Sequence, residues 1–176
     1  MEHHANIVPW HFLRERHGAV LKWVDVDAKG DLDPQAVIGA IGPRTKMVAL
    51  THMSNVLGTV VDVKTICDAA RAKGVPVLLD GSQAAVHMPV DVAEIGCDFY
   101  LVTGHKLYGP SASGALYVRR EHHEAMRPFI RGGDMIRSVT RDAATYTDAP
   151  PRVVAGTPGI VQMTGLGAAI DYLDGL

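Results

Sequence analysis

The chain has 176 residues, of which 47% are hydrophobic, and its 17 basic and 19 acidic side chains leave a formal net charge of −2. This composition is typical of one folded domain with its own core and excludes a disordered chain. The sequence has no cluster of basic residues that could bind nucleic acid or an anionic membrane surface. No apolar run approaches the roughly 20 residues that cross a bilayer. We therefore expect a globular protein with no nucleic-acid partner and no membrane partner.

Cysteine and histidine usage narrows the class of protein further. The two cysteines, Cys67 and Cys97, fall inside element-like segments and do not suggest a disulfide framework, which predicts a reducing, cytoplasmic setting. Nine histidines are present, but no HExxH or CxxC spacing occurs. We therefore predict no metal site.

Helix-like and strand-like segments alternate along the chain. Helical periodicity and end signals predict helices over residues 6–17, 33–41, 62–73, 90–95 and 160–173, with a helical turn over 121–126. Apolar or alternating runs predict strands over residues 20–27, 46–50, 76–79, 99–102 and 114–118. A segment rich in Gly, Thr, Asp and Pro, residues 131–159, is expected to be a loop.

This alternation predicts an α/β fold: three layers, with a mostly parallel sheet and helices on both of its faces. In such sheets the functional groups gather where the strands end at their carboxyl termini. Asn55, Asp80 and residues 103–106 all follow predicted strands. We therefore expect these polar residues to share one edge of the sheet.

Two of these strand ends carry an acid and an amine. Asp80 and Gln83 follow one strand, and Lys106 follows the next. A lysine amine, a carboxylate and a hydrogen-bond donor are what pyridoxal 5'-phosphate (PLP) needs, for its aldehyde, its ring nitrogen and its ring oxygen. Alone, an Asp in this place is more often a turn cap and a Lys a surface residue. The joint pattern favours PLP.

Five stretches of the sequence carry a resemblance to a known family. MEHHANIVPW, THMSNVLGT, LLDGSQAAVHMPVDV, CDFYLVTGHKLYGPSASGALYV and AGTP resemble the SufS-like, group II cysteine desulfurases. These enzymes belong to the class V aminotransferase group of fold-type I PLP enzymes. The similarity runs to about Leu173 and covers less than half of a typical member. It implies that residues 1–176 are part of the PLP-binding large domain, without the N-terminal phosphate-binding helix segment and the C-terminal small domain.

The resemblance also implies roles for the central site residues. Lys106 resembles the lysine that binds PLP covalently, and Asp80 the carboxylate on the ring nitrogen. Gln83 resembles the donor to the ring oxygen. His3 resembles the histidine that stacks on the ring and is suited to proton transfer. The residues alone do not separate His3 from His4, and the resemblance favours His3.

Four further residues receive roles at the edge of the cofactor site. Asn55 resembles a residue near the substrate carboxylate and the ring oxygen. Thr103 and His105 resemble residues that hold the phosphate, although relatives commonly have Ser at the position of Thr103. Thr157 resembles a phosphate contact that reaches over from the other subunit of a homodimer.

For the whole enzyme, the resemblance implies conversion of L-cysteine to L-alanine. The sulfur would pass as a persulfide to an acceptor protein of SufE or SufU type for iron–sulfur cluster assembly. In the family, the nucleophilic cysteine and a carboxylate-binding arginine lie in later segments, so this piece alone is expected to be inactive. Selenocysteine lyase, aminotransferase and kynureninase-like activities remain alternatives, as does a non-catalytic fragment.

Overall fold

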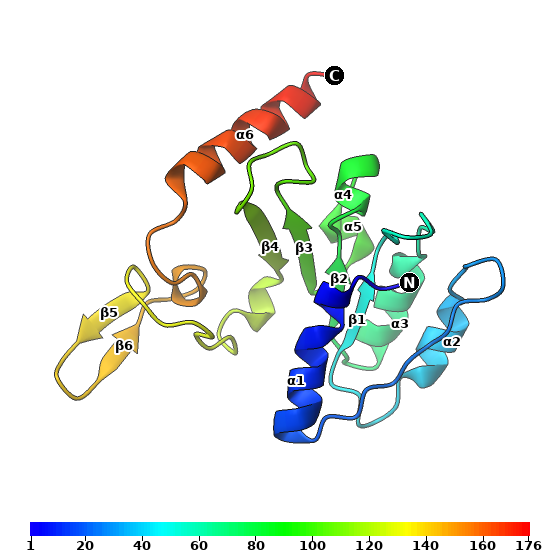
Figure 1. Cartoon of the computed structure of the whole chain (residues 1–176). Helices are drawn as coiled ribbons and strands as arrows, with labels where there is room; N and C mark the ends of the chain where they lie inside the picture. Colours follow the sequence, from blue (N-terminus) through cyan, green and yellow to red (C-terminus); the bar gives the residue numbers. More distant parts are fainter.

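The computed structural model describes residues 1–176 and centres on a four-stranded sheet (Figure 1). The strand order is β1 (Val48–Thr51), β2 (Val77–Asp80), β3 (Phe99–Thr103) and β4 (Gly114–Val118). The first three strands pair in parallel, and β4 pairs with β3 in the antiparallel sense. The predicted α/β class with a mostly parallel sheet is therefore confirmed.

Helices follow most of the strands, as expected. They are η1 (His4–Asn6), α1 (Val8–His17), α2 (Pro34–Ala40), α3 (Val63–Ala72), α4 (Ala84–His87), α5 (Val92–Ile95), η2 (Arg120–His122), η3 (Pro151–Val153) and α6 (Ile160–Asp174). Figure 1 draws α1 on one side of β1 and α2 and α3 on the other. None of these helices combines the length and the apolar character that a membrane span requires.

Local capping chemistry explains where the predicted helices begin and end. The Asp33 side chain accepts a hydrogen bond from the backbone N–H of Gln35, and Asp62 accepts one from Thr65. Gly18 ends α1 in the left-handed conformation, with φ of 66°. Such caps satisfy N–H groups and carbonyls that have no partner inside the helix.

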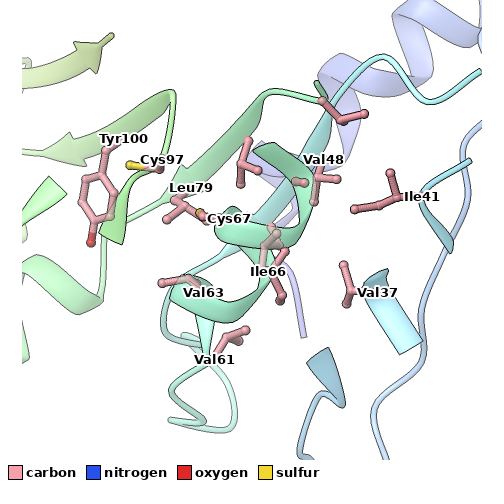
Figure 2. Packing of buried hydrophobic residues seen from close by; sticks show 14 residues of the cluster. Val37, Ile41, Val48, Val61, Val63, Ile66, Cys67, Leu79, Cys97 and Tyr100 are labelled. Carbon is pink, nitrogen blue, oxygen red and sulfur yellow. The ribbon is translucent and has the colours of Figure 1, made fainter. Parts of the chain in front are cut away.

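The core lies between the sheet and the helices α2 and α3 (Figure 2). Ile66 and Ala70 of α3 are fully buried and belong to the same apolar cluster as Val77 and Leu79 of β2. Each large aliphatic side chain buried in this way stabilises the fold by about 1.5–3 kcal/mol. The apolar face of α3 therefore fixes the position of β2, the strand that ends at Asp80.

Two predicted segments differ from the structure. Residues 20–27 form no strand, because no other strand pairs with their backbone. The segment 131–159, expected to be a loop, contains the hairpin of β5 (Ile136–Val139) and β6 (Ala144–Tyr146). These strands are short and mostly exposed, and they are held by pairing across the turn, which includes a 2.6 Å contact between the Ser138 and Thr145 hydroxyls. Apolar alternation could not signal such strands.

Candidate active site

Asp80 lies at the carboxyl edge of the sheet, between two neighbouring parallel strands. The register pairs Thr51 of β1 with Asp80 and Asp80 with Leu101 of β3. The Asp80 carbonyl accepts a hydrogen bond from the His52 N–H at 3.0 Å, and the next residue, Gly81, donates to the Leu101 carbonyl at 2.9 Å. Backbone bonds on both sides therefore fix the point from which the carboxylate emerges.

The Asp80 side chain is buried but keeps acceptor capacity. The residue is 7% exposed, and its Oδ1 accepts the Ser82 N–H at 3.0 Å. No protein donor bonds the second oxygen. A buried carboxylate with a vacant acceptor is suited to pair with a cation, because charge is stabilised by an opposite charge where water is scarce.

Lys106 emerges from a tight turn after β3. Its N–H donates to the Thr103 carbonyl at 3.3 Å, and the Gly109 N–H donates to the Gly104 carbonyl at 2.8 Å. Tyr108 adopts a left-handed φ of 57°, which non-glycine residues rarely do. At Gly104 a Cβ would lie 1.9 Å from the Ser113 Oγ, so only glycine fits against the start of β4.

The three strand ends and the N-terminal segment surround one small pocket. Its walls are formed by His3, Thr51, Met53, Asn55, Asp80, Ser82, Gln83 and Lys106. Five of these residues are predicted site residues: His3, Asn55, Asp80, Gln83 and Lys106. Neither the Lys106 amine nor the Gln83 side-chain amide has a hydrogen-bond or salt-bridge partner in the protein. The acid and the amine therefore converge on one pocket, each free to bind a ligand.

His3, and not His4, lines this pocket. The His3 Nδ1 accepts the Ala5 N–H at 3.1 Å, so the neutral ring carries its proton on Nε2. His4 is exposed, and its ring centroid lies 4.2 Å from that of His3. Of the two histidines, the one that the resemblance favours is thus the one at the site. Its role in stacking and proton transfer remains a prediction.

Three predicted phosphate contacts lie outside the pocket. The Thr103 hydroxyl and the His105 Nδ1 bond to each other at 3.0 Å. His105 is exposed on the turn that carries Lys106. Thr157 is exposed in the segment between η3 and α6, and its predicted role belongs to a second subunit. The structure does not bring these three residues to the same wall as Asp80.

Several residues of the site have no counterpart in the sequence predictions. Thr51 and Ser82 line the pocket. Both are next to predicted strand ends, and this position was the only sign in the sequence that they could belong to the site. Behind Asp80, the His52 Nδ1 lies 2.9 Å from the Tyr100 hydroxyl, in a buried pair. Burial lowers the pKa of His52 and raises that of Tyr100. His52 directly follows β1 and Tyr100 lies in β3, so no local pattern reveals this pair.

Neither cysteine is available as a nucleophile. Cys67 and Cys97 are 1% and 0% exposed. Burial raises the pKa of Cys67 to about 12 and that of Cys97 to about 11. The reactive form of cysteine is the thiolate, which these environments suppress. Both side chains therefore act as small core residues, in keeping with their places inside element-like segments of the sequence.

One acid–histidine cluster lies away from the pocket. Ligand atoms of Asp98, Glu121 and His122 lie within 4.8 Å of one another. The Asp98 Oδ1 is bonded to the His122 Nε2 at 2.8 Å and lies 3.7 Å from the Arg119 guanidinium, while Oδ2 accepts the Val77 N–H. These protein partners account for the Asp98 oxygens, and the arginine opposes a metal cation.

The family model described as aminotransferase class-V matches residues 1–176, the whole chain. The chain belongs to this family. Enzymes of the aminotransferase class-V family, cysteine desulfurases among them, depend on PLP. The family assignment agrees with the pocket, in which a lysine, an aspartate and a glutamine meet.

Relatives within the family include several cysteine desulfurases. The chain is 50% identical over 173 residues to a probable cysteine desulfurase of Xylella fastidiosa, covering 98% of the chain and 42% of that protein. It is 46% identical over 177 residues to a cysteine desulfurase of Pectobacterium atrosepticum, covering all of the chain and 44% of that protein. The chain therefore spans less than half the length of these curated relatives.

The fold matches solved cysteine desulfurases equally closely. The crystal structure of the cysteine desulfurase CsdA of Escherichia coli superposes with a TM-score of 0.94 at 40% identity, covering 98% of the chain and 43% of CsdA. The apo cysteine desulfurase of Thermococcus onnurineus superposes with a TM-score of 0.93 at 35% identity, with the same coverage. These similarities support the same α/β fold for this chain.

The donor set of the pocket fits the family's cofactor. The vacant Asp80 oxygen suits a protonated ring nitrogen, and the unpaired Lys106 amine suits the aldehyde carbon. The free Gln83 amide can donate to the ring oxygen. These groups are left unpaired inside the protein, which agrees with a ligand that supplies their partners.

Proposed function

We propose that the chain is the central part of a PLP-dependent cysteine desulfurase of the SufS-like, group II type. One observation carries this proposal. The Lys106 amine, the Gln83 amide and one oxygen of the Asp80 carboxylate have no protein partner, and the three residues line one pocket. The chain that holds them is 46–50% identical to cysteine desulfurases. The SufS-like assignment rests on the sequence stretches that resemble that group. In this proposal, residues 1–176 supply most of the cofactor's ring site, and the rest of the enzyme supplies the substrate clamp.

Each pocket residue has a distinct task in this proposal. Bound PLP withdraws electrons from the amino acid that it holds. Lys106 holds the cofactor through its amine, and the Asp80 carboxylate keeps the ring nitrogen protonated. Gln83 donates to the ring oxygen, and Asn55 orients the substrate at the rim. His3 holds or releases a proton at Nε2, because Nδ1 is occupied by the Ala5 N–H.

The proposed reaction converts L-cysteine and a protein thiol to L-alanine and a protein persulfide. The carbon–sulfur bond of cysteine breaks, a sulfur–sulfur bond forms, and the proton of the attacking thiol balances the alanine product. Cys67 and Cys97 are too buried to attack. The nucleophile of this proposal is therefore a cysteine outside residues 1–176, in keeping with relatives more than twice as long as this chain.

The biological setting is part of the same proposal. We place the enzyme in the cytoplasm as a homodimer, in which Thr157 of each subunit contacts the phosphate bound by the other. We propose that the persulfide sulfur passes to an acceptor of SufE or SufU type and from there to iron–sulfur clusters. The resemblance of the five sequence stretches to SufS-like enzymes supports this setting.

Activity of the intact enzyme tests the proposal. With L-cysteine and a thiol reductant, we expect equal amounts of alanine and sulfide. Lys106→Ala should lower the rate by about 10²–10⁴-fold or more and abolish covalent fixation of PLP by borohydride. Lys29→Ala, an exposed lysine without partners, should change neither. Production of a keto acid, or of alanine from selenocysteine alone, would assign the site to another member of the family.

A further inference from the structure

Glu2 is a half-buried acid that no step of the proposed reaction uses. Its Oε1 accepts the backbone N–H of Thr51 at 2.8 Å, and its Oε2 accepts the Asn6 Nδ2 at 2.8 Å. Asn6 is 7% exposed, and its Oδ1 accepts the Trp10 Nε1 at 3.1 Å. A hydrogen-bonded chain thus joins the end of β1 to the start of α1, and His3 lies between two of its members, Glu2 and Asn6, in the sequence.

The direction of every bond in this chain is fixed. The Trp10 Nε1 can only donate, so the Asn6 oxygen faces Trp10 and the Asn6 amide nitrogen faces Glu2. The backbone N–H of Thr51 can also only donate. Both Glu2 oxygens must therefore accept, which favours the ionised carboxylate, because it has only acceptors and accepts more strongly than the protonated acid. Burial raises the pKa of Glu2, and the negative charge of Asp80 adds to that rise. The network thus holds the Glu2 carboxylate where burial and the charge of Asp80 both disfavour its ionised form.

This network pins the segment that presents His3. The Ser54 hydroxyl bonds the Met1 carbonyl at 3.1 Å, so the chain is tied down on the other side of Glu2 as well. Figure 1 draws this N-terminal segment beside β1 and β2. Two hydrogen bonds dock residues 1–6 on the end of β1 and the residues after it, and one of the two is made by the Glu2 carboxylate. The same carboxylate also holds Asn6. Removing the Glu2 carboxylate would leave only the Ser54–Met1 bond to hold the segment that carries His3 at the pocket.

We propose that Glu2 is a positioning residue of the cofactor site, whose ionised carboxylate holds His3 over the pocket through Thr51 and Asn6. The proposal rests on the proposed function, since it assigns His3 to the face of the PLP ring. Glu2 itself does not line the pocket and contacts no ligand there. Glu2 acts by fixing the position of His3. A change in that position would alter both the affinity for PLP and the asymmetric environment of the bound cofactor.

A charge-swapped pair of substitutions tests the network directly. Glu2→Gln keeps the size of the side chain but sets a donor against the Thr51 N–H or the Asn6 amide. Asn6→Asp alone sets two acceptors against each other. Combined, Glu2→Gln/Asn6→Asp restores every bond: the introduced amide accepts from Thr51 and donates to the introduced carboxylate, which still accepts from Trp10. Glu15→Gln, an exposed acid on α1 without partners, is the matched control.

The readouts are the Kd for PLP of the intact apoenzyme and the visible circular dichroism of the bound cofactor. We expect Glu2→Gln and Asn6→Asp each to raise Kd about tenfold and weaken the dichroic band. The double variant should return Kd to within about threefold of the wild type. Single variants that match the wild type in both readouts would overturn the proposal, as would a double variant no better than the singles.

Folding controls keep the outcomes separate. Far-ultraviolet circular dichroism and thermal unfolding are recorded for each variant. Unfolded single variants with a folded, PLP-binding double variant support the network. Unfolding of the double variant overturns the proposal, because the charge on Glu2 would then serve the fold and not the site. Wild-type enzyme that fails to bind PLP refutes the proposed function as well, and only that result does so.

Discussion

Substitution of Gly81 by alanine tests how closely the sheet packs behind Asp80. A Cβ at Gly81 would lie 2.0 Å from the Tyr100 Cε1, 2.2 Å from Cζ and 2.5 Å from the hydroxyl oxygen. Ordinary contacts begin at 3.4 Å, so the ring edge must retreat by about 1.4 Å (3.4 minus 2.0). Tyr100 is 3% exposed, so it has no free space to enter. The retreat also breaks the 2.9 Å bond between the Tyr100 hydroxyl and His52.

The expected loss of stability follows from these two effects. Overpacking a core costs about 1–3 kcal/mol, and leaving a buried polar group without its partner costs about 1–3 kcal/mol more. Gly81→Ala should therefore lower the free energy of unfolding by about 2–6 kcal/mol, a large share of a typical domain's 5–15 kcal/mol. Urea denaturation, followed by far-ultraviolet circular dichroism, measures this loss. PLP affinity should fall with it, since Asp80 precedes the displaced backbone.

A second substitution separates steric overlap from other effects of the alanine. Tyr100→Leu removes the ring edge and hydroxyl that a Cβ at position 81 would meet. The loss in Gly81→Ala/Tyr100→Leu should then be smaller than the sum of the two single losses by at least about 1 kcal/mol. Gly39→Ala in α2 is the control, because nothing lies within 4 Å of its added carbon. Additive losses, or a Gly81→Ala midpoint equal to the wild type, would refute the packing argument.

Four further predictions concern pH, backbone strain and thiol chemistry. Because burial lowers the pKa of His52 from 6.5, stability should be lost as pH falls below 6.5, and His52→Asn should remove that loss. Because burial raises the pKa of Glu2 from 4.5, stability should instead decline as pH rises from 4.5, and Glu2→Gln should flatten that decline in urea titrations at stepped pH. Tyr108→Gly should raise the free energy of unfolding by about 0.5–1 kcal/mol, because glycine adopts the left-handed backbone conformation of residue 108 without steric strain. The Tyr108 side chain is 68% exposed, so its removal loses little packing. An unchanged urea midpoint would contradict this prediction. Cys67 and Cys97 should resist iodoacetamide at pH 8 in the folded protein and react in urea, and rapid labelling of the folded protein, followed by mass spectrometry, would show that they are accessible.

The sequence was sufficient where local chemistry decides structure. The helices predicted to begin at residues 33 and 62 do begin there, with Asp33 and Asp62 as N-caps, because the capping bond forms within three residues. The strand ends at Asp80 and Lys106 could also be placed, because parallel strands deliver their carboxyl termini to one edge. The convergence of acid and amine on one pocket follows from that geometry alone.

Interactions between distant segments were beyond this reasoning. Residues 20–27 alternate like a strand, but a strand also needs a partner, which periodicity cannot supply. The His52–Tyr100 pair joins the residue after β1 to β3, across β2, and the bond from the Thr51 N–H to Glu2 joins residues 49 positions apart. In each case the partner is chosen by tertiary packing. Of the site residues that the sequence analysis missed, only Thr51 and Ser82 could have been predicted, since both adjoin predicted strand ends.

The antiparallel direction of β4 has a consequence for the order in which the site assembles. The β3–β4 connection, which carries Lys106, is short. The connection between β1 and β2 is longer, because it includes α3, and these two strands can pair only after that longer loop has closed. Closing a longer loop loses more chain entropy, and non-local pairing slows folding. We therefore expect the turn that carries Lys106 to be structured in the folding transition state. The surroundings of Asp80 should form later. Substitutions in β4 should then slow refolding, while those in β1 should chiefly speed unfolding; the reverse pattern in stopped-flow kinetics would rule out this order.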